Sequence, residues 1–290
     1  MNTFSRFAGL VADLNNKHVL CAGVSGGSDL AVKLAKHGCG TLSVVDPDTV
    51  DPLNLPRTYY RTSDIGKFKV DALKAHIEAA APGSVVHAHA AKVQDVLTDA
   101  YCTGPNRPDL LLGLTDSLPG QAHLNDMAVK HGIAAELVDV HDRAAGGMVT
   151  VVVPGSPCYR CVAARRFEAA ERGDVPVDLD GALGLGADIA FIDAIALKIA
   201  LALLSAGTDT DAGRFLTKMG KRTQVVVRMH PDYRWDAVDL FDLVLADLPS
   251  VPRDFKRELQ QFAFFACDTL WLTPDFDPQC PDCAATELKP

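Results

Sequence analysis

The chain has 290 residues, of which 48% are hydrophobic and 22% charged. This balance is typical of a globular protein with one large or two small domains, and it excludes a chain that is disordered throughout. Lysine and arginine total 28 and aspartate and glutamate 37, so the net charge is −9 with neutral histidines. Because nucleic acids and anionic bilayers attract clustered positive charge, neither is expected as a partner.

The sequence indicates neither a membrane span nor a secretion signal. The most apolar helical stretch, 189–204, contains Asp193 and Lys198, whereas a spanning helix needs about 20 residues with few or no charges. Residues 1–18 lack a continuous apolar segment followed by a small-residue cleavage site. Eight cysteines are also too few for a disulfide scaffold in a chain of this size. We therefore expect a cytoplasmic protein.

The first predicted elements form one βαβ unit. An apolar strand at 17–21 leads into the glycine-rich turn GVSGGS at 23–28, and apolar residues at helical spacing predict a helix at 30–37. A second strand at 41–45 ends on Asp46. A strand, glycine turn, helix and strand followed by an acid about 20 residues after the glycines are typical of a nucleotide-binding unit.

Strands and helices continue to alternate beyond this unit. This alternation predicts an α/β, Rossmann-like fold with a mostly parallel sheet and helices on both faces. Strands are expected at 85–90, 110–114, 134–140, 148–153 and 224–229, and helices at 69–81, 121–131, 189–204 and 253–267.

The polar segment 165–186, rich in Gly and Asp, predicts a long loop that could act as a lid. We expect a nucleotide-binding domain at 1–207, which includes a crossover loop at about 162–187. A small C-terminal extension at 208–290 is expected to follow it.

The glycine turn and the acid after it are candidates for binding a nucleotide. Gly23, Gly26 and Gly27 have no side chain, so phosphate oxygens could approach the backbone amides at the start of the helix. The helix dipole favours negative charge at that position. Asp46, at a strand end, is placed to accept hydrogen bonds from a ribose. The structural alternatives are a tight strand-to-helix turn for the glycines and a turn carboxylate for Asp46.

Polar residues that could bind a triphosphate follow Asp46 in the sequence. Asn54, Arg57, Lys67 and Lys69 lie in one passage from loop to helix and offer an amide and three cations, although each could simply be solvated at the surface. Asp116 follows an apolar strand, and open α/β sheets bind ligands at that end of their strands. Its carboxylate could hold Mg²⁺ beside phosphates or merely cap a helix.

Two Cys-x-x-Cys pairs give the most specific motif of the chain. Four thiolates in two pairs suit tetrahedral Zn²⁺, and they would tie the C-terminal part back onto the α/β body. A redox dithiol is the alternative, and a catalytic zinc is less expected because four thiolates leave no open position. The four residues are Cys158, Cys161, Cys280 and Cys283.

Taken together, these motifs resemble the ThiF/MoeB and ubiquitin-activating adenylyltransferase family, from about Lys17 to Cys283. The resemblance rests on the glycine turn and on the order of VVDPDTVDPLNLPR (44–57), DIGKFKV (64–70), LTDS (114–117), PCYRC (157–161) and the distal Cys-x-x-Cys. It implies an enzyme that uses ATP to adenylate the C-terminal carboxylate of a small ubiquitin-like or sulfur-carrier protein, releasing pyrophosphate. It also implies a homodimer.

The resemblance also implies roles for individual residues. Asp46 would hold the ribose and Asp116 the Mg²⁺, and the four cysteines would form a structural zinc site. The residues that would contact the phosphates are Asn54, Arg57 and Lys69, of which Arg57 and Lys69, with Asp116, would be catalytic. The chemistry requires such groups, because a carboxylate attacking a phosphate needs cations to neutralise both anions.

The sequence departs from the family pattern at several positions. Ser25 and Ser28 stand where the family usually has glycines, and Ser117 and Gln121 replace the usual Asn and Arg after Asp116. The N-terminal arginine motif of the family is missing. Two alternatives therefore stay open: a non-catalytic member that binds a ubiquitin-like protein or an active subunit, and an enzyme that adenylates a peptide in natural-product biosynthesis. An NAD-dependent oxidoreductase has only the βαβ unit in its favour.

The remaining cysteines bear on whether the enzyme forms a thioester. No cysteine occurs between 162 and 266, where thioester-forming relatives carry the reactive one. Cys267 is expected to be a buried thiol in the helix at 253–267, and Cys21, Cys39 and Cys102 are expected to be structural. We therefore expect adenylation without a thioester cysteine in this chain.

Overall fold

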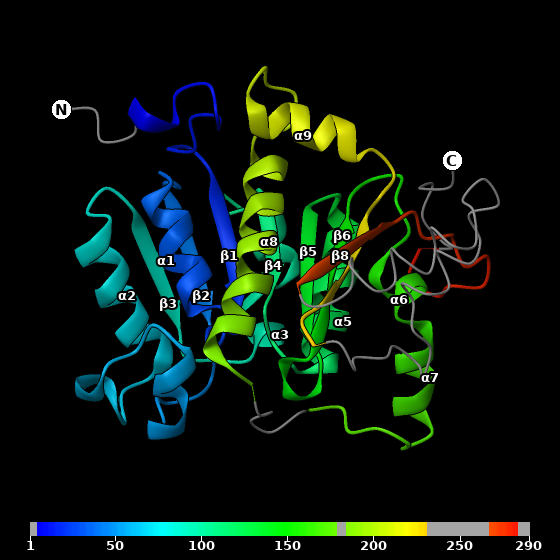
Figure 1. The fold of residues 1–290 in the computed structure, drawn as a ribbon, viewed down its shortest axis with the longest axis horizontal. Coiled ribbons are helices and arrows are strands. Elements are labelled where there is room, and N and C mark those ends of the chain that lie inside the picture. Colours follow the sequence, from blue (N-terminus) through cyan, green and yellow to red (C-terminus); the bar gives the residue numbers. More distant parts are fainter. Residues whose placement is uncertain (1–4, 179–183, 231–266, 284–290) are drawn as a thin grey trace, which may run out of the picture.

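The computed structural model describes residues 5–178, 184–230 and 267–283. Within these ranges the chain forms one eight-stranded sheet in the order β3-β2-β1-β4-β5-β6-β7-β8 (Figure 1). The first five strands are parallel, and each of the last three pairs antiparallel with its predecessor. The strands are β1 (His18–Ala22), β2 (Thr41–Val45), β3 (Val85–His89), β4 (Leu110–Gly113), β5 (Ala134–Val140), β6 (Gly146–Val152), β7 (Gln224–Arg228) and β8 (Asp268–Leu272).

Helices cover both faces of this sheet, which confirms the predicted fold class (Figure 1). On one face lie α1 (Ser28–Lys36), α2 (Lys69–Ala80), α8 (Gly186–Leu204) and α9 (Asp211–Met219). On the other face lie α3 (Val93–Val96), α4 (Asp99–Thr103), α5 (Leu118–His131), α6 (Tyr159–Val162) and α7 (Ala164–Glu171). The 3-10 helices are η1 (Ser5–Phe7), η2 (Pro52–Arg57), η3 (Thr62–Asp64) and η4 (Asp142–Ala144).

The central strands are continuous apolar runs because both of their faces are buried. In β1, Val19 and Cys21 pack into one hydrophobic cluster, whereas Leu20 and Ala22 pack into the other. A strand that is buried on both sides needs no polar alternation, so its sequence is apolar throughout. This explains why the central strands β1 and β4 could be identified from hydrophobicity alone.

Two local expectations are wrong. The segment 165–186 is not loop throughout, because residues 164–171 form α7, whose Phe167 packs edge-on against Tyr159 with ring centroids 5.8 Å apart. Cys267 is exposed rather than buried; it has a φ of 61° and directly precedes β8 instead of lying in a helix. The rest of the helix expected at 253–267 lies outside the described residues.

The other predicted structural thiols agree with the structure. Cys21, Cys39 and Cys102 are all buried. Burial raises the pKa of Cys39 to about 12 and also raises the pKa of Cys102. A thiol that stays protonated at neutral pH is a poor nucleophile and a poor metal ligand, so these three cysteines are structural.

Among the described helices, including the apolar α8, none is long and hydrophobic enough to span a bilayer.

Glu136 in β5 is a carboxyl group buried in an apolar environment. It is fully buried, and neither carboxylate oxygen has a hydrogen-bond partner within the described ranges. Its register partner on β6 is Val151, and burial raises the pKa of Glu136 well above the usual value. The folded protein therefore keeps a proton that the unfolded chain releases above about pH 4.5, so this group lowers stability as pH rises, by up to about 1.4 kcal/mol per pH unit.

Glu136→Gln is accordingly expected to be more stable than the wild type by at least about 1 kcal/mol at pH 7.5, with a smaller difference at pH 5.5. Urea unfolding at several pH values measures this difference. The control is Glu78→Gln on the exposed side of α2, where the change should have little effect at either pH. A Glu136→Gln protein with unchanged stability at every pH would contradict the expectation.

Candidate functional site

The candidate site lies where the strand order reverses, between the carboxyl ends of β1 and β4. Gly23 follows β1 with a φ of +84°, and a Cβ built on it would lie 2.6 Å from the backbone nitrogen of Thr115. A side chain at this position would meet both backbone strain and a steric clash with the backbone after β4. Gly23 is therefore required by the packing of the two loops.

The other two glycines of the turn differ in what they permit. A Cβ on Gly27 would collide with the Leu114 side chain, so this residue too is needed for close packing. A Cβ on Gly26 would meet only the side chain of Ile189, at an ordinary 3.5 Å. Ser28, at one of the substituted positions, is buried, and its hydroxyl accepts a hydrogen bond from the Tyr59 N–H at 2.9 Å.

Asp46 holds the glycine turn in place. The residue directly follows β2 and is only 5% exposed, and its carboxylate accepts hydrogen bonds from the backbone N–H groups of Val24 (2.9 Å) and Asp48 (3.0 Å). Burial raises the pKa of Asp46, while Lys69 and the two N–H groups oppose that rise. The carboxylate is thus preorganised at the start of the turn, with lone pairs left for a further donor.

Lys69 and Asp116 lie close enough to this carboxylate to interact with it. Lys69 is the first residue of α2 and is buried; its Nζ is 2.8 Å from Asp48 Oδ2 and 3.8 Å from Asp46 Oδ1. Partial burial raises the pKa of Asp116, Lys69 lowers it, and Asp178 and Asp46 raise it further. The fold therefore brings together three of the predicted site residues from β2, α2 and the end of β4.

The remaining predicted phosphate ligands lie on η2. Asn54 Oδ1 accepts a hydrogen bond from the Asp51 N–H at 3.1 Å, so this amide also helps to cap η2. Arg57 ends η2 and lines a cavity of about 230 Å³ together with Gly26. Gly26 and Arg57 thus share one cavity.

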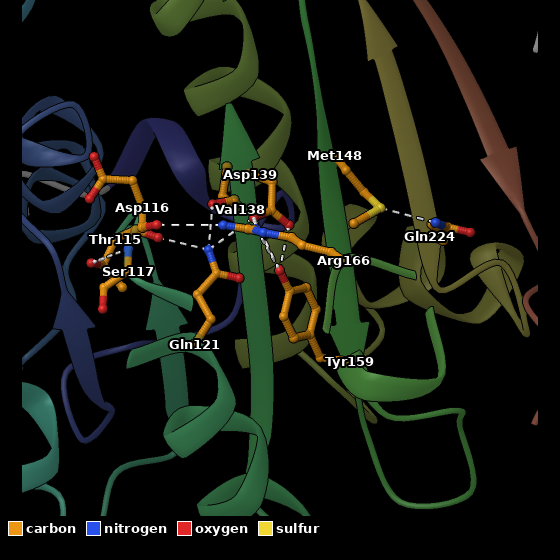
Figure 2. A network of polar contacts seen from close by, with 10 residues as sticks. All are labelled: Thr115, Asp116, Ser117, Gln121, Val138, Asp139, Met148, Tyr159, Arg166 and Gln224. Atoms are coloured by element: carbon orange, nitrogen blue, oxygen red, sulfur yellow. Dashed lines mark hydrogen bonds and ion pairs between the residues drawn. The ribbon is translucent and has the colours of Figure 1, made fainter. Parts of the chain in front are cut away.

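A buried polar network lies beside Asp116, at the ends of β4 and β5 (Figure 2). Gln121 Nε2 donates to the Thr115 carbonyl oxygen at 2.7 Å and to Asp139 Oδ1 at 3.1 Å. Within the described residues, its Oε1 has no partner. Gln121 therefore joins the ends of the two strands, although the family usually has an arginine at this position.

The second half of the network comes from α6 and α7. Tyr159 Oη donates to the Asp139 carboxylate at 3.0 Å, and Arg166 forms an ion pair with the same carboxylate and a hydrogen bond with Tyr159 Oη (Figure 2). Arg166 Nη2 also reaches the Asp116 carbonyl oxygen at 3.5 Å. Our sequence reasoning missed Asp139 and Arg166. Asp139 could have been found by its place at a strand end, like Asp116, whereas Arg166 lies in the segment interpreted as a loop.

Residues 172–178, which follow α7, run along this edge of the sheet (Figure 1). The Leu118 N–H donates to the Val177 carbonyl oxygen at 2.8 Å, which holds the segment against the start of α5. At the other end of the crossover segment, a Cβ built on Gly186 would lie 3.0 Å from the Pro56 carbonyl oxygen, so α8 begins in contact with η2. The two described ends of the crossover segment therefore lie near Asp116 and Arg57, respectively.

The four predicted zinc ligands lie together beside α5. The Sγ atoms of Cys158 and Cys280 are 3.5 Å apart, those of Cys161 and Cys283 are 3.4 Å apart, and all four lie within 4.8 Å of one another. A zinc–sulfur bond of about 2.3 Å in a tetrahedral site places sulfurs about 3.8 Å apart. The spacing and the thiol chemistry therefore fit a closed zinc site.

A hydrogen-bond network holds the distal cysteine pair in register with the first. Asp282, between the last two cysteines, accepts from Asn125 Nδ2 at 2.9 Å and from Arg160 Nε at 3.1 Å. Asn125 Oδ1 in turn accepts from the Tyr159 N–H at 2.7 Å. Side chains around metal ligands commonly orient them in this way, and our sequence reasoning had not identified Asn125, Arg160 or Asp282.

Comparison with known proteins agrees with this architecture. The Haloferax volcanii SAMP-activating enzyme E1 is 32% identical over 165 residues, which cover 56% of this chain and 58% of the relative. The Aspergillus niger adenylyltransferase and sulfurtransferase uba4 is 33% identical over 162 residues, or 51% of this chain and 32% of the relative. The chain thus spans less than two thirds of the length of these relatives.

A solved structure and a family model extend the comparison over more of the chain. E. coli MccB crystallised with ATP superposes with a TM-score of 0.63 over 97% of this chain and 73% of MccB, and at 15% identity this likeness shows a shared fold. The model of the ThiF family matches residues 5–232. From its strand order, its motifs and this match, the chain belongs to the ThiF family, whose members include E1-like adenylyltransferases.

Proposed function

We propose that this protein is an ATP- and Mg²⁺-dependent adenylyltransferase that activates the C-terminal carboxylate of a small ubiquitin-like or sulfur-carrier protein, acting as a homodimer. The observation that carries the proposal is the grouping of Asp46, Lys69 and Asp116 at the strand-order reversal of a ThiF-family sheet. A nucleotide site requires a turn that binds phosphate, an acceptor for the ribose and a carboxylate that binds Mg²⁺, and we assign these roles to the glycine turn, Asp46 and Asp116.

In the proposed reaction, the carrier carboxylate attacks the α-phosphorus of ATP. A bond forms between a carboxylate oxygen and phosphorus, the bond to the bridging oxygen breaks, and pyrophosphate leaves with its electron pair. The carboxylate is already ionised at neutral pH, so no protein base is needed. Lys69 and Arg57 would neutralise the phosphates, Asp46 would hold the ribose, and Asp116 would bind Mg²⁺, which supplies charge neutralisation.

The cysteine cluster has a structural part in this proposal. With four thiolates, zinc would have no open position for substrate or water. The cluster joins residues 158–161, next to the polar network of Figure 2, to the distal pair at 280–283. Zinc bound there would fix α6, and with it Tyr159, which contacts Asp139 at the site edge.

One observation favours a second candidate, a non-catalytic member that binds a ubiquitin-like protein. Gln121 is neutral where the family usually has an arginine, and its amide Nε2 donates to the ends of β4 and β5, so it offers a nucleotide neither a charge nor these donors. Such a protein would bind its partner with an affinity that does not depend on ATP or Mg²⁺.

Titration of Mg·ATP into the zinc-loaded protein by isothermal calorimetry separates the two candidates. We expect micromolar binding to the wild type and at least tenfold weaker binding to Lys69→Met, which keeps the aliphatic stem but removes the charge. The matched control is Lys67→Met, because this neighbouring lysine is exposed and pairs with Asp64 outside the site. Absence of nucleotide binding in a folded, zinc-loaded wild type would favour the non-catalytic candidate.

A further inference from the structure

The backbone on both sides of the Asp116 Cα atom is held by two side chains that share one carboxylate (Figure 2). Gln121 Nε2 donates to the Thr115 carbonyl oxygen at 2.7 Å, and Arg166 Nη2 donates to the Asp116 carbonyl oxygen at 3.5 Å. Both side chains also contact Asp139, Gln121 through a hydrogen bond of 3.1 Å and Arg166 through an ion pair. The backbone that carries the Asp116 carboxylate is therefore fixed, through two side chains, to the end of β5.

Asp139 is suited to hold these side chains because it is buried at a fixed place in the sheet. Its side chain is 6% exposed, and besides Gln121 and Arg166 its carboxylate accepts a hydrogen bond of 3.0 Å from Tyr159 Oη. Burial and the nearby Asp139 raise the pKa of Tyr159 well above the usual value, so its hydroxyl stays a donor. A buried carboxylate that accepts from three donors has little freedom to turn, and it restricts the groups that bind it.

We propose that Arg166 is a positioning residue of the site: held by Asp139, it fixes the backbone of Asp116 and thereby the placement of the carboxylate that is offered to Mg²⁺. The planar guanidinium suits this role, because Nη1 contacts Asp139 while Nη2 reaches the Asp116 carbonyl oxygen. The proposal rests on the proposed function, since it assumes that Asp116 binds Mg²⁺. It gives α7, which follows the cysteine cluster, a part in the reaction.

The contacts of Arg166 fit two other roles less well. To neutralise a phosphate directly, the guanidinium would have to leave Asp139 and Tyr159, and breaking a buried ion pair is costly. A mere counterion for Asp139 would need only a positive charge, which a lysine would also supply. The contact of Nη2 with the Asp116 carbonyl oxygen serves positioning alone, so it separates the two roles experimentally.

Arg166→Lys is the variant that tests positioning against charge balance. Lysine keeps a positive charge for Asp139, but its ammonium group lacks the planar fork that reaches Asp139 and the Asp116 carbonyl oxygen together. In calorimetric titrations of the zinc-loaded full chain, we expect the affinity for Mg·ATP to fall at least about fivefold. The affinity for ATP without added Mg²⁺ should not change, because only the metal-binding carboxylate is displaced. Urea unfolding should give a stability close to that of the wild type.

ATP–pyrophosphate exchange gives a second readout. The Mg²⁺ concentration for half-maximal exchange should rise at least about fivefold in Arg166→Lys, while the KM for the carrier stays unchanged. The matched control is Arg165→Lys, at the preceding residue of α7, which is exposed and lies outside the network of Figure 2.

A double variant keeps the test decisive if Arg166→Lys is unstable. Asp139→Asn combined with Arg166→Gln replaces the ion pair by neutral amides, so it leaves no buried charge without a partner. It should show the same selective loss of affinity for Mg·ATP.

The outcomes distinguish this proposal from the proposed function. Wild-type affinity for Mg·ATP in a folded Arg166→Lys or double variant would overturn the role of Arg166 and leave the proposed function intact. Equal losses of affinity for ATP with and without Mg²⁺ would also overturn it, because the defect would not lie at the metal-binding carboxylate. A folded wild type that binds no Mg·ATP would overturn the proposed function, and the role of Arg166 with it.

Discussion

Replacing Asp116 by asparagine is expected to lower ATP–pyrophosphate exchange by about 100-fold or more. The substitution keeps the size of the side chain but removes the charge that would hold Mg²⁺ at the end of β4. It should have little effect on the fold, because Asp116 is only partly buried and its backbone, rather than its carboxylate, contacts Arg166. The exchange would be measured with a panel of small carrier proteins that end in glycine.

The acidic limb of the activity provides an independent check on Asp116. Its pKa is raised by partial burial and by Asp178 and Asp46, so wild-type activity should fall on acidification at a higher pH than an ordinary carboxylate would give. Asp71→Asn, an exposed aspartate on the first turn of α2, is the matched control and should retain full exchange. Full activity in Asp116→Asn, with a carrier that supports exchange in the wild type, would refute the role of this residue.

Removing the metal from the cysteine cluster is expected to have the largest effect on stability. The cluster closes a long loop, because its paired cysteines are 122 positions apart in the sequence. Cross-linking a loop of about 100 residues contributes up to about 5 kcal/mol in the chain-entropy view, and the metal–thiolate bonds add to that. Chelation or Cys280→Ser should therefore lower the midpoint of thermal unfolding by at least about 10 °C.

Calorimetric unfolding and elemental analysis together measure this effect. We expect one zinc per chain in the wild type and in Cys267→Ser, the control, because Cys267 is exposed and lies outside the cluster. Cys280→Ser should lose both the zinc and the stability. A wild type that contains no metal but forms a disulfide within each Cys-x-x-Cys pair on mild oxidation would instead establish the redox alternative.

The central sheet and the cysteine cluster could be predicted from the sequence because their signals are local. The central strands β1 and β4 are buried on both faces, so their sequences are almost entirely apolar, which is typical of a strand in a covered sheet. The glycine-rich turn predicts a tight connection between strand and helix. The structure shows why Gly23 and Gly27 are needed, because a side chain at either position would clash with the loop after β4. The two Cys-x-x-Cys pairs could be identified as metal ligands because the spacing that allows two cysteines to bind one metal ion is visible in the sequence.

The sequence also determined which residues could form a nucleotide site, but only the tertiary structure decided how they are used. Asp46 holds the glycine turn through backbone hydrogen bonds, and Lys69 pairs with Asp48, because the folded chain brings the end of β2 next to the start of α2. Neither contact follows from residue type.

Contacts between distant segments decided the rest. The helix α7 forms where composition predicted a loop, because Phe167 packs on Tyr159 and Arg166 pairs with Asp139, which lies 27 residues earlier in the chain. In the sequence, Asp193 is one acidic residue within an apolar helical stretch. Its carboxyl group becomes buried beside a cavity only because α8 packs against α1 and η2. Burial and pairing depend on which surfaces meet, and a linear pattern does not contain that information.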